Sequence, residues 1–294
     1  MKYHLYGTNI TSDLELDAPM SKNESQLKII EGTFVTPKTL KTKIYRADCR
    51  AEIYINSAFV ILHWPGLVTF KIDKNTIIYQ KLDSSLDEGL LRIFITSEAL
   101  GIYLFLNGSF LLHGSAVMIK NKAHVFLGKP GAGKSTTVAA FAKAGFEIMA
   151  DDMVVIKLNA QNQPEVHWGG NSIKIWDKTA EGLEIDIKKL PPAWEGKNKF
   201  IFETKKHSTF DPKALKSIVV LNAPNTRKNL GNLPLIMSPT LLLQYFPLAH
   251  QLLKDENLKR HFETSIFIAQ NCIISQIKRP KNFNKLEQYI KTFL

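Results

Sequence analysis

Residues 128–136 read GKPGAGKST and complete a phosphate-binding loop of the G-x-x-x-x-G-K-[ST] type. An apolar run, His124–Leu127, precedes the loop, and an alanine-rich stretch, Thr137–Ala144, follows it. A strand, a glycine-rich loop and a helix in this order present a helix N-terminus to phosphate. A glycine-rich turn without a ligand is the alternative, but the Lys-Ser pair and both flanks argue against it. The loop therefore predicts an α/β core with a nucleotide site, although it names no reaction by itself.

Each part of the loop has an expected task in holding ATP and Mg²⁺. Its glycines let the backbone take positive φ and bring its N–H groups close to a polyphosphate. Lys134 is placed to reach the β and γ phosphates, Ser135 offers a hydroxyl to Mg²⁺, and Thr136 extends the helix cap. The residues expected to bind the nucleotide are Gly128, Lys129, Pro130, Gly131, Ala132, Gly133, Lys134, Ser135 and Thr136.

Two adjacent aspartates follow the next predicted strand. Gly145 is suited to end the helix, and Phe146–Ala150 then predicts a strand that delivers Asp151 and Asp152 at its carboxyl end. Open α/β sheets bind ligands at this end of their strands, where one carboxylate can hold Mg²⁺ and the other can take a proton from a hydroxyl. The structural alternative is that both aspartates merely cap a solvated strand end.

An apolar segment ahead of the loop is interrupted by polar and small residues. Leu111–Val117 reads LLHGSAV and predicts one strand that begins beside the site. A histidine inside such a run is, on its own, more often a core side chain than a catalytic one. The motifs that follow make His113 a candidate for the lining of the nucleotide site.

Taken together, three motifs resemble the catalytic domain of HPr kinase/phosphorylase, a bacterial P-loop enzyme that phosphorylates a serine on a small carrier protein. They are His113-Gly114, the loop 128–136 and Ala150-Asp151-Asp152. Their order and spacing match over roughly residues 88 to 160. The front of the chain looks closer to a divergent branch of related serine kinases from peptide-modification gene clusters. Some members of that branch phosphorylate a serine of a lasso-peptide precursor.

The resemblance implies a role for each matched residue. Asp151 would act as general base toward the acceptor hydroxyl, while Asp152 and Ser135 would hold Mg²⁺. Lys134 would neutralise the phosphates, and His113 would line the pocket near the transferred phosphoryl group. The implied fold is α/β (α+β overall), with an HPr kinase/phosphoenolpyruvate carboxykinase-like P-loop core and a β-rich N-terminal region.

The implied reaction is transfer of the γ-phosphate of ATP to a Ser/Thr hydroxyl of a peptide or small protein, such as the precursor of a ribosomally made, modified peptide. Two alternatives use the same ATP site: a small-molecule kinase, and a nucleotide-gated regulatory protein that binds ATP without an acceptor. HPr kinases assemble into oligomers, which keeps a homo-oligomer open.

Two departures from the family pattern narrow this expectation. Thr136 stands where HPr kinases commonly carry an acidic residue. The segment Asn171–Glu184, NSIKIWDKTAEGLE, stands where they carry a Glu-Ile-Arg-Gly-Leu-Gly run. That run is tied in the family to the reverse, phosphate-driven dephosphorylation. We therefore expect neither phosphorylase activity nor recognition of HPr itself.

Composition sets the remaining limits. The chain has 294 residues, 45% of them hydrophobic, which is enough for a sizeable core. Its net charge of +11 comes from scattered lysines without a basic arm, so no nucleic-acid partner is expected. Cys49 and Cys272 lie far apart and predict reduced thiols. Without a long uninterrupted apolar stretch or a signal-peptide core, we expect a cytoplasmic protein without a membrane partner.

The expected organisation is a β-rich region over residues 1–86 and a P-loop catalytic domain over 87–294. Pro65-Gly66 predicts a hairpin turn, and Asp87–Leu106 predicts a helix at the junction. The lysine-rich segment Glu195–Thr209 is expected to be an exposed loop, and the alternative is a mobile strap that brings lysines to the phosphate or the peptide. Arg279, with no motif beside it, is expected to be a surface charge rather than a phosphate ligand.

Overall fold

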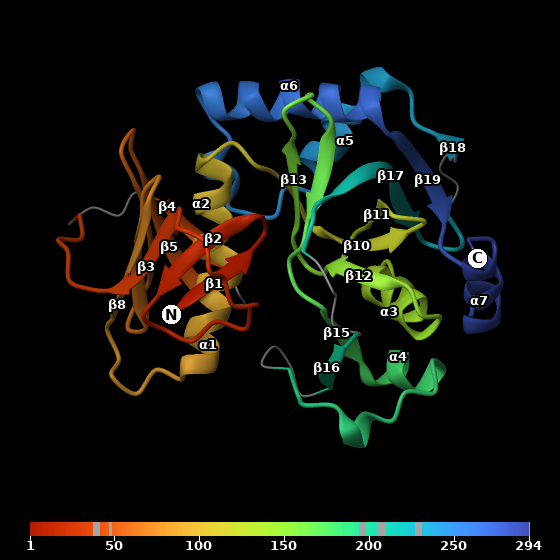
Figure 1. Ribbon diagram of the computed structural model, residues 1–294, viewed down its shortest axis with the longest axis horizontal. Coiled ribbons are helices and arrows are strands. Elements are labelled where there is room, and N and C mark those ends of the chain that lie inside the picture. The colour runs from red at the N-terminus through yellow and green to blue at the C-terminus, as the bar shows by residue number, and fades with distance from the viewer. Residues whose placement is uncertain (38–41, 47–48, 194–197, 205–209, 227–230, 294) are drawn as a thin grey trace. The chain divides into compact units, whose positions relative to one another are not determined.

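The computed structural model describes residues 1–37, 42–46, 49–193, 198–204, 210–226 and 231–293. The chain forms two compact units, one of Met1–Ser109 with Leu248–Leu258 and one of Phe110–Pro247 with Lys259–Leu294. Both contain helices and a large mixed sheet (Figure 1). The expected mixed α/β fold with a β-rich N-terminal region is therefore confirmed.

The first unit is built on a sheet whose described strands run in the order β1-β2-β3-β8-β7-β6-β5-β4. β2–β3 and β3–β8 are parallel pairs, and the remaining neighbours are antiparallel. Gly66, at φ 76°, turns the chain between β6 and β7, which confirms the predicted hairpin. The strands are β1 (Lys2–Leu5), β2 (Thr8–Ser12), β3 (Leu27–Glu31), β4 (Thr42–Arg46), β5 (Cys49–Ile55), β6 (Val60–Trp64), β7 (Val68–Ile72) and β8 (Thr76–Lys81).

The predicted helix after this sheet is confirmed as one continuous helical segment. It consists of α1 (Glu88–Ile93), a π-helical stretch η1 (Phe94–Ala99) and α2 (Leu100–Leu106). The side chain of Asp87 caps its start by accepting a bond from the backbone N–H of Leu90 at 3.0 Å. By length and hydropathy this segment could cross a membrane, yet 61% of its most apolar window is buried in the structure. Such burial is typical of a helix in a protein core.

Two contacts join this helical segment to the first sheet. The Phe94 ring stacks on Trp64 with centroids 4.3 Å apart. Arg46 donates to both oxygens of the buried Glu98 carboxylate, at 2.9 and 2.7 Å. Because of such contacts the units divide at Ser109/Phe110, whereas the predicted boundary at residues 86/87 lies before the helix.

The second unit contains a sheet in which the described strands follow the path β12-β10-β11-β17-β14-β13-β9. β19 pairs in parallel with the later part of β17, from Ser217 to Asn222, and β18 pairs with β19. Among the described residues, a separate two-stranded sheet pairs β15 with β16 in antiparallel order. The strands are β9 (Phe110–Leu112), β10 (Gly114–Ile119), β11 (Lys122–Leu127), β12 (Glu147–Ala150), β13 (Val154–Leu158), β14 (Pro164–His167), β15 (Ser172–Trp176), β16 (Lys199–Glu203), β17 (Lys213–Asn222), β18 (Gly231–Asn232) and β19 (Ile273–Lys278).

Helices bury both faces of this sheet. Neighbouring residues of β11 enter opposite cores: Leu127 joins the cluster that includes Leu242 and Ile268, whereas Phe126 packs with Phe141 and Leu286. This alternation explains why the central strands read as unbroken apolar runs in the sequence. The helices of this unit are α3 (Lys134–Lys143), α4 (Asp177–Gly182), η2 (Ile187–Lys189), η3 (Leu235–Met237), α5 (Ser238–Leu243), α6 (Asp255–Asn271) from Lys259 onward, and α7 (Phe283–Lys291). The short helix η4 (His250–Leu252) and the first turn of α6 belong to the first unit.

One buried histidine in the second unit makes the stability of the fold depend on pH. His261 on α6 stacks on Phe110 with centroids 4.4 Å apart and meets the Phe246 ring edge at 5.5 Å. Neither ring nitrogen has a hydrogen-bond partner among the described residues. Burial, with a smaller effect of the Arg260 charge, lowers the pKa of His261 to about 4.

Acidification should therefore destabilise the fold through His261. Its folded pKa lies below the ordinary 6.5, so the unfolded chain binds the proton first and stability is lost as the pH falls from 6.5 toward 4. Between pH 7 and 4.5, protonation of this single group in the unfolded chain should lower the free energy of unfolding by about 2–3 kcal/mol. In thermal melts across this range, His261→Phe should lose less stability than the wild type. If Tm fell by the same amount in both proteins over this pH range, the low pKa of His261 would not be the cause.

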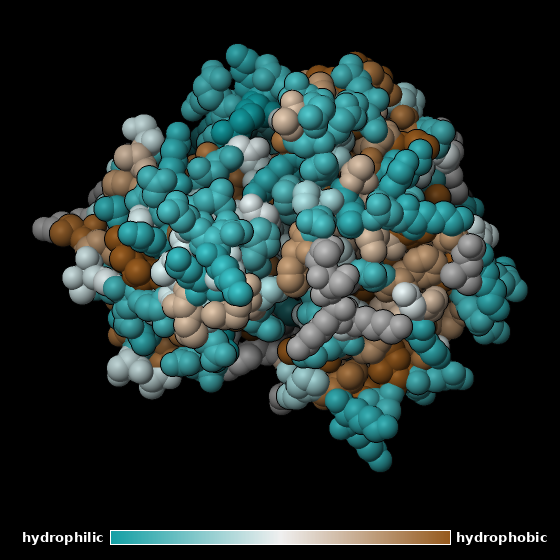
Figure 2. Space-filling view, in the orientation of Figure 1, coloured by the Kyte–Doolittle hydropathy of each residue, from teal (hydrophilic) through white to brown (hydrophobic). Residues whose placement is uncertain are grey.

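Hydrophilic side chains cover most of the face seen in Figure 2, and hydrophobic ones gather there in small patches. The lysines that give the chain its charge of +11 are spread along the sequence. This distribution gives a well-hydrated face, in line with the scattered charge predicted for the surface.

Candidate active site

The carboxyl ends of four strands meet at one edge of the second sheet. β11, β17 and β19 are parallel, and β12 has the same direction because both it and β11 are antiparallel to β10. The phosphate-binding loop follows β11, the aspartate pair follows β12, and Arg279 follows β19. The fold therefore brings the predicted loop and the predicted acidic residues to the same edge.

His113 and the aspartates lie where two neighbouring strands change partners. The stretch 110–119 pairs first through β9 with β13, and then through β10 with β12. The ladders end at Leu112 opposite Val154 and resume at Ala116 opposite Ala150. The single strand predicted for Leu111–Val117 is thus wrong, because the chain breaks at His113 into two strands with different partners.

Gly114 occupies this break because there is no room for a side chain. A Cβ atom there would lie 2.6 Å from Leu127 Cδ2 and 2.8 Å from the carbonyl oxygen of Phe126. The close approach of β10 to β11 fixes the position of the His113-Gly114 motif next to the phosphate-binding loop. Substitution of Gly114 would push these two strands apart.

The phosphate-binding loop has the backbone conformation that its sequence predicts at two of its glycines. Gly131 has φ 76° and Gly133, the N-cap of α3, has φ 92°. Gly128 does not take positive φ, which corrects the expectation for this residue. Its requirement is steric, since a Cβ atom would lie 2.7 Å from Ala132 Cβ and 3.1 Å from the Leu221 carbonyl oxygen.

The ammonium group of Lys134 folds back over the loop. Its Nζ donates to the carbonyl oxygen of Gly128 at 2.8 Å. Burial lowers the pKa of Lys134, while the charges of Asp152 and Asp151 act in the opposite direction. The structure therefore brings this lysine within electrostatic reach of the aspartate pair.

Two hydroxyl residues follow Lys134 in the first turn of α3. Ser135 is half-buried, at the position predicted for a Mg²⁺ ligand. The hydroxyl of Thr136 instead pairs with the hydroxyl of Thr179 on α4 at 2.9 Å. The side chain of Thr136 thus ties α3 to α4.

Asp151 is held by two donors and has a raised proton affinity. The buried Ser115 hydroxyl donates to Oδ1 at 2.5 Å, and the backbone N–H of Lys174 donates to Oδ2 at 3.2 Å. Burial and the negative charge of Asp152 raise the pKa of Asp151 to about 6. A carboxylate of this kind is ionised at neutral pH and accepts a proton more readily than an ordinary aspartate.

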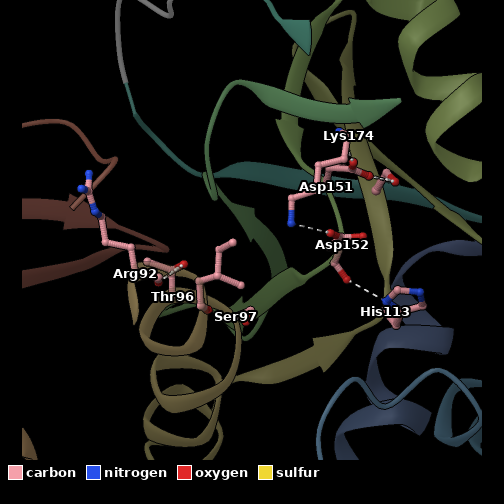
Figure 3. Close-up of polar contacts among 9 residues, drawn as sticks. Arg92, Thr96, Ser97, His113, Asp151, Asp152 and Lys174 are labelled. Carbon is pink, nitrogen blue, oxygen red and sulfur yellow. Dashed lines mark hydrogen bonds and ion pairs between the residues drawn. The ribbon is translucent and has the colours of Figure 1, made fainter. Parts of the chain in front are cut away.

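Asp152 has a different environment, although it is the next residue. Its backbone lies in the left-handed region at φ 64°, and its carbonyl oxygen accepts a bond from His113 Nδ1 at 3.0 Å (Figure 3). Its carboxylate pairs with Lys174 Nζ at 3.3 Å, while the side chain stays 48% exposed. Burial opposes ionisation, but Lys174, Lys199 and His113 together lower the pKa of Asp152. This carboxylate is ionised and accessible.

Two lysines on the paired strands β15 and β16 also belong to the site. Lys174 was not predicted, and Lys199 lies in the segment for which a lysine-bearing strap was the less favoured alternative. Lys174 contacts both aspartates, and the charge of Lys199 acts on Asp152 and Lys134. Part of the segment 195–209, expected to be a loop, is strand β16; residues 195–197 and 205–209 lie outside the described residues. The run of β-favouring apolar residues Phe200–Phe202 was the available signal for that strand.

Arg279 lies against the phosphate-binding loop, so the expectation of a surface charge is wrong. A Cβ atom on Gly133 would lie 2.5 Å from Arg279 Cδ and 2.9 Å from its Nη1. Its Nε is buried and has no hydrogen-bond partner within the part of the chain that the structure describes. The backbone N–H of Arg279 donates to the carbonyl oxygen of Asn222 at 2.8 Å, which fixes the residue at the end of β17.

These features fit a nucleoside triphosphate with Mg²⁺. The loop offers close backbone approach, and the buried Nε of Arg279 lacks the acceptor that a phosphate oxygen would supply. Asp152 and Ser135 are oxygen ligands of the kind that Mg²⁺ prefers. The described residues contain no group of three or more His, Cys, Asp or Glu side chains arranged for a metal. Most ligands of a Mg²⁺ ion here would therefore be phosphate oxygens and water.

No family model matches the chain, and no curated protein matches it. Among solved structures, it is similar to the HPr(Ser) kinase/phosphatase from Coxiella burnetii, with a TM-score of 0.32 and 12% sequence identity. The match covers 62% of this chain and 92% of that chain. The similarity is distant.

Proposed function

We propose that the protein is an ATP- and Mg²⁺-dependent kinase that transfers the γ-phosphate to a serine or threonine hydroxyl of a peptide or small protein. One observation carries the proposal: two adjacent aspartates with opposite pKa shifts lie at the same sheet edge as a complete phosphate-binding loop. Carboxylates whose environments push their pKa values apart suit a base and a metal ligand, respectively.

The residues divide the work of phosphoryl transfer. The loop amides, Lys134 and Arg279 bind the phosphates and offset their charge. Ser135 and Asp152 would hold Mg²⁺, which would supply positive charge that offsets the charge of the triphosphate. His113 fixes the turn at Asp152 through its bond to the carbonyl oxygen.

Asp151 would serve as the general base toward the acceptor. As the acceptor oxygen forms its bond to the γ-phosphorus and the bond to ADP breaks, the hydroxyl proton passes to the Asp151 carboxylate. Ser115 and the Lys174 N–H hold that carboxylate in place through the reaction. Lys174 and Lys199 add positive charge at the site, which favours acidic peptides as acceptors.

The acceptor class is tested by incubating the protein with Mg-ATP and either acidic serine-containing peptides or a panel of hydroxyl-bearing metabolites. Mass spectrometry should find phosphate on a serine or threonine of a peptide, and Asp151→Asn should slow the formation of that product by about 10²–10⁴-fold. Phosphorylation of a metabolite alone would identify a small-molecule kinase instead. ATP binding without any acceptor-dependent product would identify a nucleotide-gated binding protein.

A further inference from the structure

A cavity of about 310 Å³ adjoins the phosphate-binding loop within the second unit. Loop residues Lys129–Ala132 form one wall, and Arg279 lies beside them. The opposite walls come from Asn222 at the end of β17, Gln276 on β19, and Gln244 with Tyr245 after α5. Its size is at the lower end of the range for small-molecule sites, about 300–1,000 Å³.

The cavity and the aspartate pair lie on opposite sides of the loop strand. The sheet order β12-β10-β11-β17 places β12, which carries the aspartates, on one side of β11. β17 and β19, which carry Asn222, Gln276 and Arg279, lie on the other side. A polyphosphate whose terminal group faces the aspartates would therefore extend its other end toward the cavity.

The lining of the cavity has the chemistry of a nucleoside site. Three side-chain amides, those of Asn222, Gln244 and Gln276, supply both donors and acceptors, which are the groups that read the edge of a base. Asn222 Nδ2 donates to Gln276 Oε1 at 3.3 Å, so these two amides are already aligned. Leu241 and Tyr245 add apolar and aromatic surface on which a base can pack.

Arg279 connects the cavity with the loop. Its side chain touches Gly133 and lines the cavity, and its buried Nε lacks a partner among the residues that the structure describes. An arginine in this place can bond a phosphate oxygen near the sugar while its planar guanidinium packs against the nucleoside. The cavity is therefore continuous with the phosphate site through a cationic side chain.

We propose that this cavity binds the nucleoside part of the donor nucleotide, with the base at the amides of Asn222, Gln244 and Gln276. Arg279 then lies between the nucleoside and the phosphates on the loop. This inference rests on the proposed function, since it assumes that the loop holds the triphosphate of the same molecule. It assigns nucleotide selectivity to Asn222 of β17, Gln276 of β19 and Gln244, which follows α5.

The test compares Mg-ATP with Mg-tripolyphosphate, which carries the phosphates without the nucleoside. Gln244 is exposed at the end of α5, so Gln244→Trp should fill the cavity without disturbing the core. By calorimetry, this variant should bind Mg-ATP at least about tenfold more weakly and Mg-tripolyphosphate within about twofold of the wild type. Gln161→Trp, on an exposed turn after β13, is the matched control and should change neither affinity.

A milder variant, Gln244→Ala, keeps the test valid if tryptophan disturbs the fold. It should weaken Mg-ATP about threefold or more and leave Mg-tripolyphosphate unchanged. Unchanged ATP affinity in both variants, or equal weakening of both ligands, would overturn the cavity assignment while the loop remained a phosphate site. A wild-type protein that binds neither ligand would instead overturn the proposed function itself.

Discussion

Asp151→Asn is expected to lower the rate of phosphoryl transfer by about 10²–10⁴-fold while Mg-ATP affinity stays within about twofold of the wild type. Asparagine keeps the size of the side chain and an oxygen that can accept the bond from Ser115 or from Lys174, but it cannot take the acceptor proton. Single-turnover transfer to the best peptide acceptor measures the rate, and calorimetry measures the affinity.

The same substitution should not cost stability, which separates a functional from a structural role. Burial and the charge of Asp152 disfavour an ionised Asp151, so a neutral side chain at this position should give an equal or higher melting temperature at pH 7. Asp211→Asn, at an exposed aspartate of the same unit, is the control and should leave transfer unchanged. Near-normal turnover of Asp151→Asn would show that another group acts as the base.

Lys134→Ala is expected to weaken Mg-ATP binding at least about 10²-fold and to reduce kcat/KM by about 10³-fold or more. The substitution removes a half-buried ammonium group that bonds within the loop and lies near both aspartates. Without it, the phosphates lose a cationic partner and the two carboxylates lose a compensating charge. Nucleotide titration and steady-state transfer assays measure the two effects.

Lys143→Ala provides a matched control, because Lys143 is the last residue of the same helix and forms an exposed ion pair with Glu184 at 3.1 Å. Exposed ion pairs contribute little, so this variant should bind and react like the wild type. Values for Lys134→Ala within about threefold of the wild type would mean that the loop does not hold the phosphates of the donor.

Local patterns predicted the elements that depend on neighbouring residues. The glycine positions and Lys-Ser pair located the loop at the start of α3, and the spacing of apolar residues located the helical segment 88–106. Both signals lie within a few turns of chain, where periodicity and capping act directly. The strand β2 (Thr8–Ser12) escaped prediction because its inward side includes Thr8 and Ser12, which are polar but buried.

Features that depend on distant partners could not be predicted in the same way. Leu111–Val117 is apolar throughout except at His113-Gly114-Ser115, and only its pairing with β13 and then with β12 shows that it forms two strands. Nothing in the sequence around Arg279 indicates that β19 runs beside β17 and thereby places this side chain on Gly133. Strand order, a long-range property, decides both outcomes.

In the candidate site, too, local motifs were predicted and residues brought in by distant strands were not. The motifs placed His113, the loop and the aspartate pair together, and the structure brings them to one sheet edge. Lys174 and Lys199 reach it from β15 and β16, which lie outside the stretch 88–160 that carries the resemblance. The roles assigned to His113, Ser135 and Asp152 in catalysis and metal binding stay predictions.

Calorimetric titration of the purified chain with ATP, in the presence and absence of Mg²⁺, shows whether the loop 128–136 holds a nucleotide together with the metal. We predict saturable binding that requires Mg²⁺, with a Kd between about 1 µM and 1 mM, and its loss in Lys134→Ala. Absence of Mg²⁺-dependent binding for both ATP and GTP at millimolar concentration would contradict the account.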